Sequence, residues 1–330
     1  MKVLVLGAGG AAGVNFSRCA IEAGHKVIGC DTDPVALQAA RCQERELVEA
    51  NRSPDALNVI IEKYGVDFVH AQPDPEVQWL AANQHLLNAR TMLPDRATLF
   101  IAADKYRTAQ VAGADAPASL PITSETDLAE AIDTLGGDCW LRQRSGAGSA
   151  GALPVSDPEI ARAWIKHHYR YGVADSEWVL AKLLPGKDLS WTGVFRDGVM
   201  MGYAMKERVR GLGAGRSPAR VASTASLQKT IWRLDVEHVC ERVIAALPGP
   251  ANGVLMMDLR EDENGYPKLT EINAGRFGTT SLFWHAAGGN LVQIYLEASR
   301  GEAMTPLLRV CRVGFAWYRD TDVGPRLVEV

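Results

Sequence analysis

Two apolar segments that flank an Asn-Gly dipeptide constrain the fold of this chain more than any other feature. Residues 254–260 and 266–273 have the composition of strands. Asn264-Gly265 lies between them, and this dipeptide favours a tight hairpin turn because both residues tolerate positive φ. A hairpin centred on the dipeptide pairs Asp258 with Glu271 across the two strands. The sequence therefore predicts an antiparallel hairpin that holds two carboxylates side by side.

The same register gives this hairpin a face rich in oxygen ligands. It pairs Glu263 with Tyr266 beside the turn, and it places Asn273 on the face that carries Asp258 and Glu271. Directly opposed residues have Cβ atoms about 5 Å apart, so the two carboxylates repel unless a proton or a cation lies between them. Carboxylate and amide oxygens suit Mg²⁺. The alternative is a solvated sheet face that carries charged pairs, and a register slip of one residue would remove the site.

The N-terminal part of the chain alternates between strand and helix patterns. Residues 3–6, 27–30 and 66–71 are apolar runs typical of buried strands. A helical pattern separates the first two runs, and Asp55 is expected to cap a second helix that continues to Ile61. The order predicts a parallel βαβαβ unit with right-handed crossovers.

The loop Gly7–Gly13 (Gly-Ala-Gly-Gly-Ala-Ala-Gly) fits the dinucleotide-binding pattern GxGxx(G/A). Asp31, at the end of the second strand, has the position of a ribose-binding acid. An NAD(P) site is therefore one interpretation. In the other, the glycines only turn the chain from the first strand into the first helix.

The pattern of elements changes beyond residue 94. The loop 145–151 (Ser-Gly-Ala-Gly-Ser-Ala-Gly) is a second candidate for nucleotide binding, because its backbone is able to fold over phosphates. The alternative is a flexible surface turn, which has the same composition. The remaining predicted elements are helices 104–112 and 127–134, a strand 139–143, a helix through Trp164, neighbouring antiparallel strands 178–183, 189–195 and 199–206, and a helix 226–247.

Composition excludes several classes of protein. The 330 residues include 35 basic and 39 acidic side chains, and a net charge of -4 provides no basic field for nucleic acid or an anionic membrane. The six cysteines form no CxxC pair, which favours the reducing cytoplasm. The N-terminus is expected to be neither a signal peptide nor a membrane span. The seven histidines show no spacing typical of metal ligands.

Asp258 followed by residues 271–278 (Glu-Ile-Asn-Ala-Gly-Arg-Phe-Gly) resembles the metal-binding end of ATP-grasp enzymes. The similarity is to the branch of the carbamoyl phosphate synthetase large subunit and D-alanine:D-alanine ligase. It implies an α/β and α+β protein, with an ATP-grasp fold preceded by a Rossmann-like parallel-sheet domain. The implied domains are residues 1–94, the N-terminal ATP-grasp subdomain 95–184 with the glycine loop, and the C-terminal subdomain 185–330 with the hairpin.

The resemblance also implies roles for particular side chains. The phosphates would be bound by the cations Lys105, Arg142 and Lys206 or Arg208, and by the loop residues Ser145, Gly146, Gly148 and Ser149. The adenine would contact Lys182, Leu183 and Leu184, and the ribose would be bound by the acid Asp188. The metal would be bound by Asp258, Glu271 and Asn273, and Arg276 would contact the transferred phosphate or an acyl phosphate, although it could instead form a structural ion pair.

The activity implied by this resemblance is ATP-dependent ligation. ATP would convert a carboxylate into an acyl phosphate, which an amine-type nucleophile then attacks to form an amide-like bond. The expected cofactors are ATP and Mg²⁺, with two ions expected and Mn²⁺ as an alternative; the partners are small molecules, with no nucleic acid and no membrane. The alternatives are a kinase-like phosphotransferase, a non-catalytic nucleotide sensor and an NAD(P) oxidoreductase. The oligomeric state stays open, with a homodimer among the options.

Overall fold

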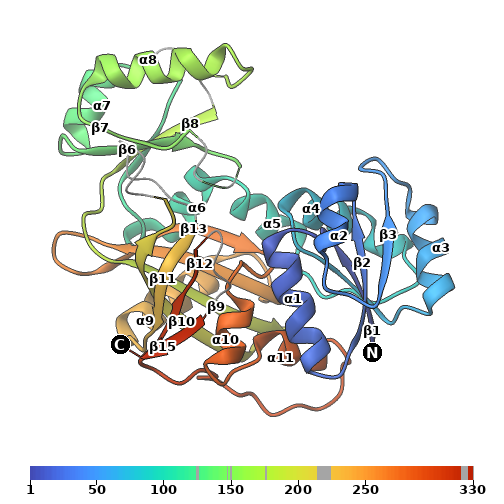
Figure 1. Cartoon of the computed structure of the whole chain (residues 1–330). Coiled ribbons are helices and arrows are strands. Elements are labelled where there is room, and N and C mark those ends of the chain that lie inside the picture. Colours follow the sequence, from blue (N-terminus) through green and yellow to red (C-terminus); the bar gives the residue numbers. More distant parts are fainter. Residues whose placement is uncertain are drawn as a thin grey trace.

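Three β-sheets organise the chain (Figure 1). The structure is a computed structural model, and it describes residues 1–123, 126–146, 148, 151–174, 177–213, 224–320 and 326–329. The mixed α/β and α+β class expected from the sequence is confirmed. The predicted domain boundaries after residues 94 and 184 stay a prediction.

The N-terminal sheet is parallel and has the strand order β3-β2-β1-β4. Helices α1 and α2 pack on one face of it, and α3 and α4 pack on the other. The elements are β1 (Lys2–Leu6), α1 (Ala11–Glu22), β2 (Lys26–Asp31), α2 (Pro34–Ala39), β3 (Glu44–Leu47), α3 (Pro54–Tyr64), β4 (Phe68–Ala71), α4 (Asp74–Asn83) and a 3₁₀ turn (Gln84–Leu86).

Two expectations for this sheet are wrong. Helix α2 and the edge strand β3 were not predicted; the residues of β3, Glu-Arg-Glu-Leu, alternate between half-buried and exposed and so form no apolar run. Asp55 does not cap α3. Ser53 does so, because its hydroxyl accepts a hydrogen bond from the backbone N–H of Ala56 at 3.2 Å.

The second sheet is small and antiparallel, with the order β5-β8-β6-β7. Trp178 is fully buried at the centre of its own core cluster. The elements of this part of the chain are α5 (Arg96–Ala102), α6 (Lys105–Ala112), a 3₁₀ turn (Gly113–Asp115), β5 (Ser119–Pro121), α7 (Leu128–Thr134), β6 (Cys139–Gln143), β7 (Leu153–Val155), α8 (Pro158–Tyr169) and β8 (Trp178–Lys182).

The third sheet is antiparallel, and within the described ranges it has the order β13-β12-β9-β10-β11-β14-β15. Helix α9 packs on one face, and α10 and α11 pack on the other. The elements are β9 (Asp188–Arg196), β10 (Val199–Gly211), β11 (Ala225–Thr230), α9 (Leu234–Ala246), β12 (Gly253–Glu261), β13 (Pro267–Ala274), α10 (Ser281–Ala286), α11 (Leu291–Ala298), β14 (Phe315–Tyr318) and β15 (Arg326–Glu329).

Two further expectations fail in this part of the chain. β8 was expected beside β9, but it pairs with β5 and β6 of the small sheet. The helix expected over residues 226–247 is a strand, β11, followed by the shorter helix α9. Polar and apolar residues alternate only over the first four residues of β11, Ala225 to Gln228, and the longer helical pattern that follows obscures this short alternation.

An aromatic cluster joins the parallel sheet to the large sheet. The His70 ring, on β4, stacks on Phe16 of α1 with centroids 4.1 Å apart, and the Tyr295 hydroxyl lies 3.2 Å from His70 Nδ1. Phe277 packs against all three rings. Burial lowers the pKa of His70 to about 3, so the ring is neutral. Figure 1 shows α1 beside α10 and α11 at this junction.

Neither a disulfide nor a membrane-spanning helix is found among the described residues. All six cysteines are free thiols, and five of them are buried. Among the helices of the described residues, none is long and apolar enough to cross a membrane.

Candidate active site

The hairpin β12–β13 pairs Asp258 with Glu271, as the sequence predicted. Its turn differs from the prediction. The backbone N–H of Asp262 donates to the carbonyl of Tyr266 at 2.9 Å, so Tyr266 is paired with Asp262 and the expected pairing with Glu263 is wrong. Three residues therefore connect the strands. If this register continued unchanged along the hairpin, every later pair would differ from the predicted pair by one residue.

A β-bulge at Thr270 restores the predicted register. Leu259 pairs with Leu269, the next pair along the strands is Asp258 with Glu271, and Thr270 is the extra residue. The bulge lets Leu269 and Ile272, three residues apart, both face the core. Without it they would lie on opposite faces of the strand. The carboxylate pair thus depends on two irregularities that compensate each other.

The carboxylates of the hairpin lie among cations. An Arg208 nitrogen lies 2.7 Å from Asp258 Oδ1, and Lys105 Nζ lies 3.6 Å from Glu271 Oε1. Burial opposes ionisation of Asp258, but the charges of Arg208 and Lys206 outweigh it and lower the pKa of the carboxyl group. The Asn273 amide nitrogen lies 3.5 Å from Asp258 Oδ2, so the three predicted metal ligands share one face.

A cavity of about 320 Å³ extends from this face to the segment between β8 and β9. Its lining includes six predicted nucleotide-binding residues, Arg142, Lys182, Leu183, Leu184, Asp188 and Arg208, together with Asp258 and Glu271. We refer to it as the hinge cavity. Its volume is at the lower end of the range for small-molecule sites.

The walls of the hinge cavity offer specific polar groups. The N–H of Leu183 already donates to the Asp138 carbonyl at 3.0 Å, while the N–H of Leu184 has no protein acceptor among the described residues. Lys182 Nζ donates to Glu263 at 2.7 Å beside the hairpin turn. Burial raises the pKa of Asp188, although Arg208 opposes the rise. Of the backbone N–H groups of Leu183 and Leu184, which were expected to contact the adenine edge, only that of Leu184 is therefore without an acceptor in the described structure.

The predicted phosphate cations lie around the hairpin. Lys105 Nζ donates to the carbonyl of Gly146 at 2.7 Å, and the Arg142 guanidinium donates to the carbonyl of Thr270 at 2.8 Å. Lys206 is 4% exposed and donates to the Thr280 hydroxyl at 2.5 Å. Burial lowers the pKa of Lys105, although Glu271 opposes this change. These three cations therefore come from three different parts of the chain.

The glycine loop is only partly described. Ser145 and Gly146 line a cavity with Lys105, and Gly148 lines another cavity with Lys206. Ser149 lies outside the described residues. The described residues of the loop therefore line cavities that also contain predicted phosphate cations, and the binding of a nucleotide by this loop stays a prediction.

Arg276 joins the hairpin to the parallel sheet. It forms an ion pair with Asp74, the first residue of α4, and it also donates to Asn273 Oδ1 at 2.5 Å. Arg276 therefore forms a structural ion pair, which was the alternative role expected for it. Its contact with a transferred phosphate stays a prediction. Sequence reasoning missed Asp74 as a site residue, because a lone acid between two prolines gave no chemical signal.

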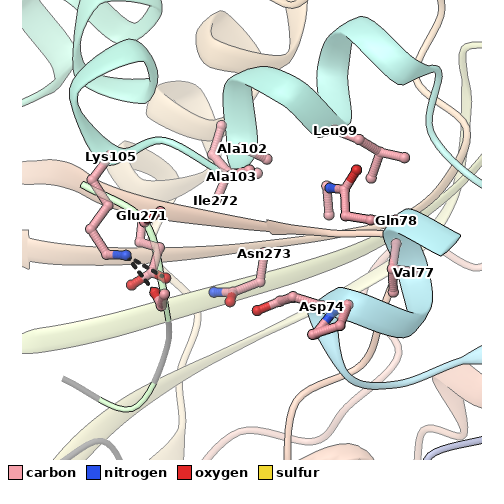
Figure 2. A pocket seen from close by; sticks show the side chains of 14 residues that line it. Asp74, Val77, Gln78, Leu99, Ala102, Ala103, Lys105, Glu271, Ile272 and Asn273 are labelled. Atoms are coloured by element: carbon pink, nitrogen blue, oxygen red, sulfur yellow. Dashed lines mark hydrogen bonds and ion pairs between the residues drawn. The ribbon is translucent and has the colours of Figure 1, made fainter. Parts of the chain in front are cut away.

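A second cavity, of about 480 Å³, lies between α4, α5, α6 and β13 (Figure 2). Its walls are largely apolar and include Val77, Leu99 and Ile272. Glu271 and Asn273 also line it, so the hairpin face borders this cavity as well as the hinge cavity. A molecule bound here would lie next to the phosphate end of a nucleotide bound in the hinge cavity.

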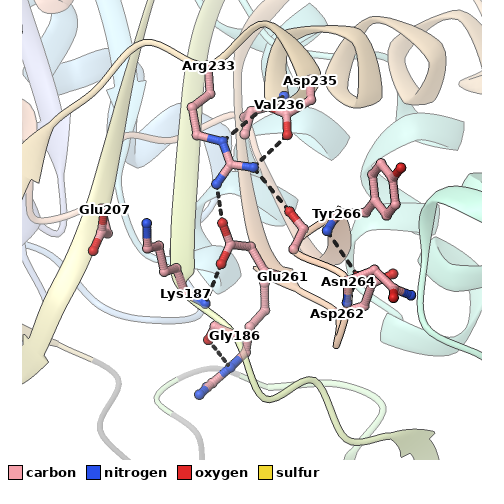
Figure 3. Close-up of polar contacts among 12 residues, drawn as sticks. Gly186, Lys187, Glu207, Arg233, Asp235, Val236, Glu261, Asp262, Asn264 and Tyr266 are labelled. Atoms are coloured by element: carbon pink, nitrogen blue, oxygen red, sulfur yellow. Dashed lines mark hydrogen bonds and ion pairs between the residues drawn. The ribbon is translucent and has the colours of Figure 1, made fainter.

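A polar network holds the segment between β8 and β9 in place (Figure 3). Glu261, at the end of β12, accepts hydrogen bonds from the backbone N–H of Lys187 on its side chain and of Gly186 on its carbonyl, each at 3.0 Å. Arg233 forms ion pairs with Glu261 and Asp235. A Cβ on Gly186 would lie 2.4 Å from Glu261 Cβ, so only glycine fits there. No sequence motif indicated this network.

The N-terminal glycine loop has little room for a dinucleotide. A Cβ on Gly9 would lie 2.1 Å from the carbonyl oxygen of Ala36. The backbone of Ala36 therefore occupies the space in which a dinucleotide would approach Gly9. The Asp31 carboxylate accepts hydrogen bonds from the N–H groups of Gly9 at 2.8 Å and Asp33 at 3.1 Å. The acid expected to bind a ribose is thus used within the fold, which favours the interpretation that the glycines serve packing.

Comparisons with known proteins agree on the fold. The sequence matches no protein-family model and no curated protein. Among solved structures, N5-carboxyaminoimidazole synthetase from Staphylococcus aureus aligns with a TM-score of 0.73 and 16% identity over 96% of this chain and 81% of that one. The L-amino acid ligase from Bacillus licheniformis gives 0.69 and 12% over 96% and 78%. A biotin carboxylase from Campylobacter jejuni gives 0.68 and 14% over 96% and 74%.

Identities this low establish the architecture alone. The chain folds along nearly its whole length as these synthetases, ligases and carboxylases do, and the fold expected from the sequence is confirmed.

Proposed function

We propose that this chain, which has the ATP-grasp fold, is an ADP-forming carboxylate-amine ligase that acts on small molecules in the cytoplasm. One observation carries the proposal. Asp258, Glu271 and Asn273 share a face of the hairpin, and cavities of about 320 and 480 Å³ meet at that face. The first has the lining for a nucleotide, and the second has room for a substrate at the phosphate end of that nucleotide.

The residues present fit a magnesium nucleotide. Two carboxylates and an amide form a hard-oxygen donor set of the kind that Mg²⁺ prefers, and the described residues bring no third His, Cys, Asp or Glu side chain to it. The buried Nε of Arg142, which lines the hinge cavity, has no hydrogen-bond acceptor in the described part of the chain. A bound phosphate would supply one. Bound Mg²⁺ would neutralise charge on the β- and γ-phosphates.

The reaction follows from charge placement. A carboxylate oxygen of the acid attacks the γ-phosphorus of ATP, the bond from that phosphorus to the bridging oxygen breaks, and ADP leaves with the electron pair. Lys105 and Arg142 hold phosphate oxygens in line, and Arg276 offsets the charge that develops. The amine nitrogen then attacks the acyl carbon, phosphate leaves, and the nitrogen loses a proton.

An ADP-release screen across carboxylates and amines tests this function. We expect release that requires a carboxylate, an amine and Mg·ATP, and a fall of at least about 100-fold in Glu271→Ala, the order of magnitude for losing one electrostatic contact in a transition state. Glu44→Ala, on the exposed edge strand β3, is the control and should keep full activity. ADP release that needs no amine would instead indicate a kinase-like phosphotransferase.

A thermal-shift experiment separates the other classes. ATP with Mg²⁺ should stabilise the protein, whereas NAD(P) should not, since a ligand stabilises only the fold that binds it. Stabilisation by NAD(P) that Asp31→Ala abolishes would contradict the proposal in favour of an oxidoreductase. Stabilisation by ATP with no carboxylate-stimulated turnover in the screen would favour a sensor.

A further inference from the structure

A third cavity, of about 230 Å³, adjoins the hairpin carboxylates. It shares Arg208, Asp258 and Glu271 with the hinge cavity, and it shares Glu271 and Asn273 with the cavity beside α4. Its lining also includes Lys206, Gln228, Thr280 and Arg319. Gln228 and Arg319 come from β11 and from the residue after β14, and no sequence motif pointed to either.

Arg319 is a half-buried cation whose hydrogen-bond partners among the described residues are all neutral. Its guanidinium donates to the carbonyl of Ala225 at 2.9 Å and to the Thr279 hydroxyl at 2.8 Å. Within the described ranges, no carboxylate lies within 4 Å of it, whereas Arg208 is paired with Asp258. A desolvated cation without a counterion is costly, so the arrangement favours a bound anion.

Lys206 shares this lack of an acidic partner. It is 4% exposed, and its hydrogen-bond acceptor is the neutral hydroxyl of Thr280. The other arginine of this cavity, Arg276, already has Asp74 as its counterion. Two of the four cations that line the cavity therefore have no carboxylate within 4 Å in the described part of the chain.

Gln228 is an independent sign of a ligand. It is 1% exposed, and neither its amide oxygen nor its amide nitrogen has a hydrogen-bond partner in the described structure. A buried polar group left unpaired costs about 1–3 kcal/mol. Because Gln228 lines the same cavity as Lys206 and Arg319, a single ligand could satisfy all three side chains.

We propose that Arg319, Gln228 and Lys206 form an oxyanion subsite, which receives the carboxylate of the acid substrate or the phosphoryl group transferred to it. This inference rests on the proposed function. A nucleotide bound in the hinge cavity with its phosphates toward the hairpin would have its γ-phosphate at Asp258 and Glu271, and these two residues also line the cavity of the subsite. Arg319 is then a substrate-binding residue that selects the acid through the guanidinium N–H groups left free by its contacts with Ala225 and Thr279.

The test titrates malonate and, separately, inorganic phosphate into the full chain saturated with Mg·ADP, by calorimetry. We expect binding of at least one anion, a loss of affinity of at least tenfold in Arg319→Met, and a smaller loss in Arg319→Lys. Arg41→Met, an exposed arginine near β3, is the matched control and should change nothing. A loss confined to phosphate assigns the subsite to the phosphoryl group, and a loss confined to malonate assigns it to the acid.

Gln228→Leu distinguishes a ligand-binding role from a structural one. Removing the unpaired amide should raise the melting temperature and at the same time weaken anion binding several-fold. Unchanged affinity for both anions in Arg319→Met and Gln228→Leu, or no anion binding by the wild-type chain, overturns the inference. Failure of the wild-type chain to bind Mg·ADP would instead refute the proposed function, and the same titrations without nucleotide would still test the subsite.

Discussion

Lys206 is deeply buried, and no carboxylate of the described residues lies within 4 Å of its ammonium group. Burial, followed by the repulsion of Arg208, lowers its pKa to about 7, from an ordinary value near 10.5. Between these two pH values the unfolded chain binds a proton that the folded chain does not. The stability of the fold should therefore rise as the pH increases from about 7 to about 10.5, and the cost of the buried ammonium is fully present below pH 7.

Lys206→Met should remove this contribution. We expect the variant to be more stable than the wild type at pH 7 by about 1 kcal/mol or more, since one pKa unit corresponds to about 1.4 kcal/mol. Its stability should also rise less between pH 7 and 10, as measured by chemical denaturation across that range. Lys26→Met, at an exposed lysine, should follow the wild-type profile. Identical profiles for Lys206→Met and the wild type would contradict the prediction.

Gly9 tests the role of the N-terminal glycine loop. Because an added Cβ would lie 2.1 Å from the carbonyl oxygen of Ala36, Gly9→Ala should destabilise the protein by about 1–3 kcal/mol, the usual cost of overpacking. Gly10→Ala is the matched control, since its nearest neighbour would lie 3.9 Å away and its φ is -70°. Thermal denaturation of both variants measures the difference, and equal melting temperatures would show that the loop can open.

The β-bulge of the hairpin controls two features of the site. It keeps Glu271 opposite Asp258, and it presents the carbonyl of Thr270 to Arg142. Deleting Thr270 would remove the bulge without moving any later side chain to the other face, because the three-residue turn alone sets a register in which Glu271 still opposes Asp258. The acceptor of Arg142 would be lost with the deletion.

We therefore expect the Thr270 deletion to fold, with a melting temperature within a few degrees of the wild type, and to bind Mg·ATP about tenfold more weakly. That factor corresponds to one charge-assisted hydrogen bond. Calorimetric titration with Mg·ATP measures it. Deletion of Ile272 instead removes a core side chain and should unfold the protein. Unchanged ATP affinity in the Thr270 deletion would mean that Arg142 does not depend on the bulge.

Local sequence patterns predicted elements best where one face or one turn dominates. The strand predicted over residues 139–143 and the helices predicted over residues 104–112 and 127–134 agree with β6, α6 and α7 to within one residue. β3 and β11 were missed because an edge strand and a polar strand contain no apolar run. The carboxylate pair was predicted correctly although the turn was not, because the bulge compensates for it. The partners of β8 depend on long-range packing, which no local pattern encodes.

At the scale of the whole molecule, the parallel sheet and the large sheet share a core. Each of two core clusters contains side chains from both sheets, so the site between them depends on how the sheets are joined. The Asp74–Arg276 pair spans this junction at the site, and the His70 cluster spans it in the interior. No local pattern predicted these contacts, since 202 positions separate Asp74 from Arg276 and 225 separate His70 from Tyr295.

His70 makes this junction sensitive to acid. Its pKa is about 3 in the folded chain because of burial, and near 6.5 in the unfolded chain, so the unfolded state gains a proton first as the pH falls. The stability that neutral His70 permits is fully present above pH 6.5 and is lost progressively as the pH falls toward 3. The unpaired buried Nε2 gives the imidazole no acceptor for a second proton.

His70→Phe should weaken this acid dependence. The phenyl ring can keep the stack on Phe16, and the Tyr295 hydroxyl keeps the carbonyl of Met92 as its acceptor at 2.9 Å. We expect the melting temperature of the wild type to fall more steeply than that of the variant between pH 6.5 and 4.5, and the two curves should diverge by several degrees. His238→Phe, at an exposed histidine, controls for the loss of a titrating group. Parallel curves for His70→Phe and the wild type would show that the junction opens and hydrates before the imidazole is protonated.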